Sequence, residues 1–191
     1  MEIEYLLRSW RTTDAPSLAW YANEPEVAVN LRDTFPSPYG LDDAKAYIQQ
    51  CREREDVQLC RAIIIKGEAV GSITVIPGTD IYRRSAEIGY WLAKPYWGKG
   101  LMTEIAGQIC REAFERFNIV RIGAEVYSRN MGSRRVLEKN GFTLEGILRR
   151  NVFKNGKLLN SRIYGLLKDD LKAKDDLRAK EEAKAKEEAA E

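Results

Sequence analysis

The residues with the clearest chemical potential form a glycine-rich turn, Gly98-Lys99-Gly100, directly before an apolar-periodic segment that begins at Leu101. Two glycines permit a tight turn, and the first backbone N–H groups of a helix have no carbonyl partner within it. With the positive end of the helix dipole, such groups bind a phosphate or pyrophosphate. The alternative is a tight connection without a ligand. A dinucleotide-binding fingerprint fits less well, because its third glycine would fall at Thr103, and no Walker A sequence is present.

The composition excludes several other chemistries. The chain has 191 residues and no histidine, so it has no Ser-His-Asp triad, no Cys-His pair and no H-E-x-x-H zinc site. Its three cysteines lack C-x-x-C spacing, which argues against a disulfide framework and a cysteine-rich metal site. A net charge of +2 gives no large basic field for nucleic acid, and no apolar run approaches the roughly 18 residues of a membrane span. We therefore expect a cytoplasmic protein that uses no metal and binds neither nucleic acid nor membrane.

The hydrophobic pattern predicts the elements that hold the turn. A two-wide apolar stripe at steps of four runs from Leu101 to Phe117 and is typical of an amphipathic helix, with Cys110 as a buried small hydrophobe. β-rich runs at 86–93 and 119–126 flank it and predict a strand–helix–strand crossover. Residues 23–40 contain three prolines and are expected to be a loop with at most a short helical turn. Further strands are predicted at 3–7, 58–65, 69–76, 142–153 and 158–167, and further helices at 12–22, 42–54 and 133–139.

The C-terminal segment differs in composition from the rest of the chain. From Lys168 it consists of four near-copies of a six-residue unit, KDDLKA, KDDLRA, KEEAKA and KEEAAE. Six residues advance an α-helix by about 600°, so the apolar positions fall on different sides and no coiled-coil seam accumulates. Acid-before-base pairs at i and i+4, such as Asp170 and Lys174, favour a solvated, partly frayed helix. We expect a domain over residues 1–168, with a mildly basic body, and a charged tail over 169–191 that is helical or disordered.

Three segments around the turn carry a specific combination of residues. They are AEIGYWL at 86–92 running into YWGKG at 96–100 and Thr103-Glu104, NMGSRRVLEKNGF at 130–142, and EGILR at 145–149. Jointly they resemble the GCN5-related N-acetyltransferase (GNAT) superfamily, and within it the ribosomal-protein N-terminal acetyltransferases that modify serine or alanine. The resemblance covers about residues 3–168. It implies a single GNAT-like α/β (α+β) domain with a mixed, mostly antiparallel sheet of six to seven strands and about four flanking helices, followed by the charged helical tail.

The resemblance also implies the acyl donor, acetyl-CoA, and how it is held. Its pyrophosphate would rest on the backbone of Trp97, Gly98, Lys99, Gly100, Leu101, Met102 and Thr103. Its pantetheine arm would pair like an added strand with Trp91, Leu92 and Ala93. Asn130 would cap the helix after it and contact the pantetheine, although asparagine is also an ordinary N-cap residue. Where the superfamily has Gln or Arg before the turn this chain has Pro95, so backbone donors would do most of the phosphate binding.

Acetyl transfer to an amine needs a base for the amine proton, donors for the developing oxyanion and a proton for the leaving thiolate. Strand alternation places Glu87 on the same face as Gly89 and Trp91, and we interpret Glu87 as the base, directly or through water. The alternative is a carboxylate that is solvated or paired with Arg83 or Arg84. By resemblance, a backbone N–H near Leu92 would stabilise the oxyanion. The tyrosine acid of many members is Leu137 here. By resemblance to the ribosomal-protein branch, Ser133 would be the acid, although serine is also an ordinary N-cap residue. Phe35 and Tyr39 are assigned to the acceptor pocket from loop position alone.

The hypothesis is therefore an N-acetyltransferase, an acyltransferase that moves an acetyl group from acetyl-CoA directly to a primary amine. The acceptor would be a protein N-terminus or a small-molecule amine, including polyamines. Two alternatives stay open: a catalytically silent acyl-CoA-binding sensor, and a partner-binding protein that uses the charged tail. The oligomeric state is also open, with an exposed strand after Gly146 as a candidate for pairing in a homodimer.

Overall fold

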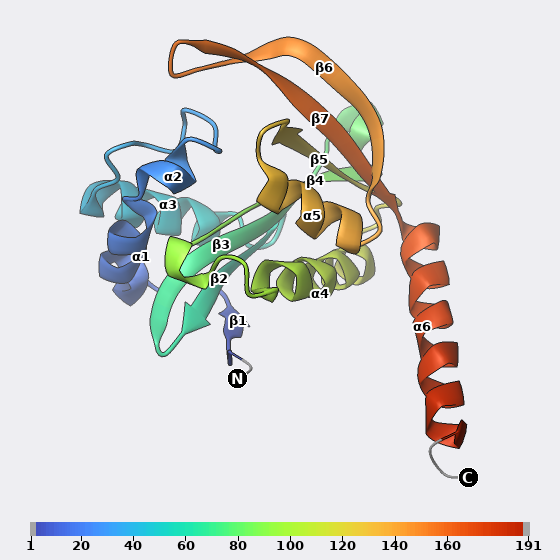
Figure 1. The fold of residues 1–191 in the computed structure, drawn as a ribbon. Coiled ribbons are helices and arrows are strands. Elements are labelled where there is room, and N and C mark those ends of the chain that lie inside the picture. The colour runs from blue at the N-terminus through green and yellow to red at the C-terminus, as the bar shows by residue number, and fades with distance from the viewer. Residues whose placement is uncertain (1–2, 189–191) are drawn as a thin grey trace.

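The sheet is built around one parallel pair of strands. The computed structural model describes residues 3–188, and its seven described strands have the order β1-β2-β3-β4-β5-β7-β6 (Figure 1). Only β4 and β5 run parallel; the other neighbours are antiparallel, which confirms a mixed, mostly antiparallel sheet. The strands are β1 (Leu6–Arg8), β2 (Leu59–Ile65), β3 (Glu68–Pro77), β4 (Ser85–Leu92), β5 (Arg121–Tyr127), β6 (Thr143–Lys154) and β7 (Lys157–Leu167).

Helices cover both faces of the sheet. One buried cluster joins β2, β3 and β4 to the apolar stripe of α4, and a second lies beneath α1 and α3 on the opposite face. The predicted loop at 23–40 contains one short helix, α2, as expected.

No helix among the described residues combines the length and the apolar character needed to cross a bilayer. The helices are α1 (Ala15–Ala22), α2 (Pro25–Ala28), α3 (Leu41–Glu53), α4 (Leu101–Arg116), α5 (Met131–Lys139) and α6 (Lys168–Glu188).

The long helix α4 connects the two parallel strands, so the predicted crossover is confirmed. Its apolar stripe is buried along its length, and Cys110 in that stripe is fully buried, as the pattern predicts. Helix α4 begins after Gly100, whose left-handed φ of +81° favours glycine. The glycine turn therefore lies at the N-terminus of a helix that the core holds in place.

Strands β4 and β5 pair over three positions only, Ser85–Glu87 with Arg121–Gly123. On its other edge β4 bonds β3: the Ala93 N–H donates to Val70 O, and the Gly78 N–H to Ser85 O, both at 2.8 Å. Antiparallel ladder bonds fall on alternate residues, so the backbone groups of Tyr90 and Leu92 face away from β3. Because the pairing with β5 ends at Glu87, these backbone groups face the opening between β4 and β5.

Helix α6 projects away from the sheet, but its first turns pack against the domain (Figure 1). Leu171 is buried in the main core cluster, and Arg111 of α4 forms two hydrogen bonds with Asp175, at 2.7 and 2.9 Å. The Lys174 ammonium also donates to the Lys139 carbonyl. The expectation of a solvated helix from residue 169 is therefore wrong for these turns. Leu171, the leucine of the first repeat, packs into the core, and the six-residue periodicity did not predict that contact.

The packing of β3 against β4 can be tested at two glycines. A Cβ atom at Gly71 would lie 2.6 Å from Trp91 O and 3.2 Å from Leu92 Cα, both backbone atoms, whereas one at Gly89 would meet nothing within 4 Å. Overpacking costs about 1–3 kcal/mol, so we expect Gly71→Ala to lower the melting temperature by several degrees. Gly89→Ala is the matched control and should leave it within about a degree. Equal melting temperatures in thermal unfolding would contradict this close approach.

Candidate active site

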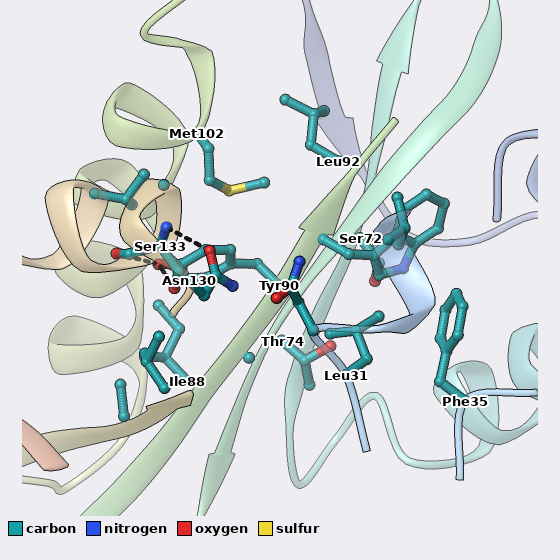
Figure 2. Close-up of a pocket in the computed structure, with 18 of the residues that line it drawn as sticks. Leu31, Phe35, Ser72, Thr74, Ile88, Tyr90, Leu92, Met102, Asn130 and Ser133 are labelled. Carbon is teal, nitrogen blue, oxygen red and sulfur yellow. Dashed lines mark hydrogen bonds between the residues drawn. The ribbon is translucent and has the colours of Figure 1, made fainter. Parts of the chain in front are cut away.

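A cavity of about 940 Å³ lies where β4 and β5 separate. It is bounded by these strands, the glycine turn, α5 and the loop after α2, and Figure 2 shows side chains converging on it from both sides of β4. The structure brings together thirteen of the fifteen predicted site residues in its wall: Phe35, Tyr39, Glu87, Trp91, Leu92, Trp97, Gly98, Gly100, Leu101, Met102, Thr103, Asn130 and Ser133. Ala93 and Lys99 are not among the lining residues.

The glycine turn has the geometry of an anion cradle. Gly98 and Gly100 have φ values of +71° and +81°, and a Cβ atom at either would meet nothing within 4 Å, so the backbone there is open to a ligand. The N–H groups of Thr103 and Glu104 are bound to Gly100 O. Those of the preceding residues in the first turn have no carbonyl one turn earlier. The cradle therefore fits the pyrophosphate of a CoA thioester.

The end of β4 presents one backbone donor to the cavity. The Trp97 indole N–H donates to Leu92 O at 2.6 Å and occupies that carbonyl, while the Leu92 N–H faces the opening. Ala93 differs from the prediction, because its N–H is bound to Val70 O and the residue lines a smaller cavity on the far side of the strand. Lys99 lies with its ammonium 5.7 Å from the centre of the Tyr96 ring. Leu92 is therefore the residue of this group that is placed to hydrogen-bond a carbonyl in the cavity.

A pair of hydroxyl groups joins β4 to the start of α5. The Tyr90 hydroxyl lies 2.9 Å from Ser133 Oγ, and the Asn130 side chain caps α5 by accepting from the Ser133 N–H at 3.1 Å (Figure 2). Burial raises the pKa of Tyr90 well above its usual value, so this phenol stays protonated. The sequence analysis missed Tyr90, although strand alternation already placed it opposite Glu87, on the face that α4 covers. Leu137, which stands where many members of the superfamily have a tyrosine, is fully buried in the core and has no group that could donate a proton.

Glu87 approaches the cavity from the other face of β4. Its carboxylate is 2.6 Å from the Arg32 guanidinium, and both side chains are more than half exposed. The structure has the ion-paired carboxylate of the alternative interpretation, but with another partner than Arg83 or Arg84, because the loop after α2 brings Arg32 to the strand. That loop is also fixed by the Tyr127 hydroxyl, which donates to Leu31 O, and by an ion pair between Lys154 and Asp33. Glu87 therefore lies at an accessible point of the cavity wall, beside an exposed cation.

Three aromatic side chains form the wall beneath this loop. The ring of Phe35 lies 4.8 Å from that of Tyr39 and 5.9 Å from that of Trp91, measured between centroids. Burial raises the pKa of Tyr39, which keeps its phenol neutral. Tyr47, Ser72 and Thr74 continue the wall with hydroxyl groups. The cavity thus has a largely uncharged side under the loop and an anion-binding side at α4.

The described residues contain no group of three or more Cys, Asp or Glu side chains that could hold a metal ion. The arrangement instead offers backbone donors for an anion, one N–H for a developing oxyanion, a carboxylate on one face of β4 and a hydroxyl pair on the other. These are the groups that direct acyl transfer from a thioester requires.

Comparison with known proteins agrees with this geometry. Residues 5–143 match the family model described as an acetyltransferase (GNAT) domain. The chain is 31% identical over 143 residues to the "Uncharacterized N-acetyltransferase YoaA" of Bacillus subtilis, which covers 75% of this chain and 73% of that protein. It is 35% identical over 106 residues to the "Putative ribosomal N-acetyltransferase YdaF" of the same organism, covering 56% of this chain and 57% of that protein.

Solved structures show the same architecture with a CoA derivative bound. Mycobacterium smegmatis RimJ, in complex with CoA-disulfide, has a TM-score of 0.78 and 26% identity, covering 87% of this chain and 83% of that one.

The anion cradle can be tested with one added carboxylate. We expect Gly98→Asp to weaken acetyl-CoA binding by at least about tenfold, or about 1.4 kcal/mol, because the carboxylate would repel the pyrophosphate. Gly156→Asp in the β6–β7 turn is the matched control, since Gly156 has a φ of +75° and the same open surroundings but lies outside the cavity wall. Calorimetric titration of both variants and the wild type measures the difference. Equal affinities for the two variants would show that the turn does not bind the cofactor.

Proposed function

This chain belongs to the GNAT family and is an acetyl-CoA-dependent N-acetyltransferase, and on that premise we propose that its acceptor is the α-amine of a protein N-terminus. The observation that carries the proposal is the charge of the cavity wall. Two carboxylates line it among the described residues, and both are engaged: Glu87 by Arg32, and Glu125 by the Asn151 amide at 3.1 Å. Four basic side chains line it as well: Arg32, Arg54, Arg135 and Lys139.

A polyamine is a poor match for such a wall. Outside α5, two guanidinium groups balance the two carboxylates of the wall, so the several ammonium groups of a polyamine would meet no net negative charge there. A peptide N-terminus brings one amine followed by neutral amides, which suit the polar, uncharged groups of this wall, such as Asn30, Gln58, Ser72 and Thr74. The name of the YdaF relative, which includes ribosomal N-acetylation, gives further support for a protein acceptor.

The pKa of the acceptor amine also favours a protein N-terminus. An α-amine has a pKa of about 7.7–8.0 and is partly neutral at physiological pH, whereas a lysine-type amine, with a pKa of about 10.4, is almost fully protonated. The proposed base, Glu87, is an exposed carboxylate that already has a cationic partner. Such a group suits an amine that needs little help to lose its proton. Arg32 would move aside as the acceptor enters, which leaves Glu87 to take the proton directly or through water.

The remaining roles follow from the cofactor side of the cavity. The backbone of the glycine turn, from Trp97 to Thr103, would hold the pyrophosphate, with Asn130 beside the pantetheine. The Leu92 N–H would donate to the thioester oxygen as negative charge develops on it. Arg135 and Lys139 line the cavity from α5 and would provide cations for the 3′-phosphate of CoA.

Ser133 would give its proton to the leaving thiolate, with Tyr90 as a positioning residue. A phenol is the stronger donor of the two, so we assign the Tyr90 proton to Ser133 Oγ at 2.9 Å over Ser133 O at 3.3 Å, which leaves the serine proton free to point into the cavity. Many family members have a tyrosine at the position of Leu137. In this chain the phenol beside Ser133 comes from Tyr90 of β4 instead. The silent-sensor alternative is not favoured, because the relatives are named as acetyltransferases. Partner binding by the tail, a cytoplasmic location and a homodimer stay predictions.

The acceptor class can be tested with matched amines. We expect kcat/KM to be at least about tenfold higher for a peptide that begins with a free serine or alanine than for spermidine. The same peptide with a blocked N-terminus and an internal lysine is the control for amines in general. Product masses and initial rates measure all three. Spermidine turnover equal to or faster than that of the free peptide would overturn the proposed acceptor without touching acetyl-CoA binding.

The hydroxyl pair can be tested by two substitutions. We expect Ser133→Ala to lower kcat by about 10²-fold, and Tyr90→Phe by about 3–10-fold, with little change in the KM for acetyl-CoA. Because burial raises the pKa of Tyr90, its phenol keeps its proton across the assay range. The wild-type rate should therefore show no loss attributable to Tyr90 up to about pH 10. In the Ser133→Ala background, Tyr90→Phe should have almost no further effect, because the phenol acts through the serine. A full additional loss there would contradict the positioning role.

A further inference from the structure

Two buried cysteines that take no part in acetyl transfer lie in contact behind the acceptor wall. Cys51 of α3 and Cys60 of β2 have their sulfur atoms 2.8 Å apart, and both are free thiols with less than a tenth of their surface exposed. The third cysteine, Cys110, is buried in α4 in the other core cluster. The chain therefore contains one cysteine pair in contact and one separate cysteine of equal burial.

Several hydrogen-bond donors converge on one sulfur of the pair. The Thr74 hydroxyl donates to Cys60 Sγ at 3.3 Å, and the Tyr47 hydroxyl lies 3.7 Å from it. The Trp10 indole N–H, in the same core cluster, is buried and has no hydrogen-bond partner among the described residues. Together with the Cys51 thiol, these groups lower the pKa of Cys60, while that of Cys51 is raised by the hydrogen bond to Cys60 and by burial.

One sulfur of the pair borders the cavity, and the other lies behind the cavity wall. Cys51, Tyr47 and Thr74 all line the cavity wall, and Cys60 lies directly behind them. A hydroperoxide is small and uncharged and can pass where a larger disulfide reagent cannot. The site thus combines a sulfur surrounded by hydrogen-bond donors, a second sulfur in contact with it and a cavity wall that the second sulfur borders, which are the features of a peroxide-reactive dithiol.

We propose that Cys51 and Cys60 form a redox modification site that hydrogen peroxide converts reversibly to a disulfide. The Cys60 thiolate attacks one peroxide oxygen, which forms a sulfenic acid and releases hydroxide. The Cys51 sulfur then attacks the Cys60 sulfur, the S–O bond breaks and water leaves. Each sulfur loses one electron and the peroxide gains two, so two thiols and one H₂O₂ give one disulfide and two waters. A dithiol reductant reverses the change.

The modification would alter the acceptor wall and leave the cofactor side in place. As a disulfide, the Cys60 sulfur would accept the hydrogen bond from the Thr74 hydroxyl less well, and its contact with the Tyr47 hydroxyl would change. Tyr47 also lies 2.7 Å from Ser72 Oγ, so a change at Cys60 reaches a second lining residue. The glycine turn of α4 contains no part of this network.

The test counts thiols and does not depend on the acceptor proposed above. The full-length protein is treated with a few equivalents of hydrogen peroxide, quenched, denatured and alkylated, and its intact mass is measured. The treated wild type should carry one alkyl group where the untreated protein carries three, and a sample left unalkylated should be about 2 Da lighter. A dithiol should reverse both changes. Peptide mapping should place the crosslink between residues 51 and 60. Cys110→Ser is the matched control and should form the same disulfide.

Two further variants separate the roles of the sulfurs. Cys51→Ser should stop at a sulfenic acid on Cys60 that a dimedone-type reagent traps, and Cys60→Ser should keep both remaining thiols over the same exposure. If these variants fold poorly, the wild type and Cys110→Ser still decide the matter. Three intact thiols in the treated wild type, or oxidation of Cys110 at the same rate as the pair, would overturn the proposal.

Discussion

The separation of two parallel strands is the constraint on which the site depends. Strands β4 and β5 share three paired positions and then diverge, which leaves the backbone groups of Tyr90 and Leu92 without a strand partner. Unpaired backbone groups inside a protein are costly. The wedge-shaped opening between β4 and β5, called the wedge below, is therefore stable only if water or a ligand with matching groups fills it. One ligand amide or carbonyl can replace the missing strand. The opening between β4 and β5 therefore offers unpaired backbone groups to a ligand with an extended polar arm.

The wedge also explains how one strand serves two steps of a transfer reaction. Successive side chains of β4 point to opposite faces, so Glu87 and Trp91 face the side of α1 and α3, while Tyr90 and Leu92 face α4 and α5. Where the sheet is closed, these faces are separated. Where β4 and β5 diverge, a single cavity reaches both. An amine can thus arrive from one side of the thioester while the thiolate leaves toward the other, and the two proton transfers do not compete for the same space.

Local signals in the sequence were enough for most of the fold and for the glycine turn that borders the cavity. The stripe of α4, the glycine turn and the asparagine cap of α5 are each contained in a few consecutive residues, and the structure has all three where the pattern placed them. The groups that were missed depend on contacts between distant segments. Arg32 reaches Glu87 across 55 residues and Tyr90 reaches Ser133 across 43. Leu171 enters the core only because β7 ends beside α4. Hydrophobic periodicity describes neighbouring residues only, so it does not predict contacts between distant segments.

The absence of histidine changes how acid and base functions are distributed. A histidine would change its charge near neutral pH, whereas the groups gathered here are a carboxylate paired with a guanidinium, a serine, and a tyrosine whose raised pKa holds its proton. Under the proposed function, the group that titrates near neutral pH is the acceptor amine itself. An α-amine, with a pKa of about 8, meets that requirement, and a more basic amine does not. The same composition that excludes a catalytic triad therefore argues for a weakly basic acceptor.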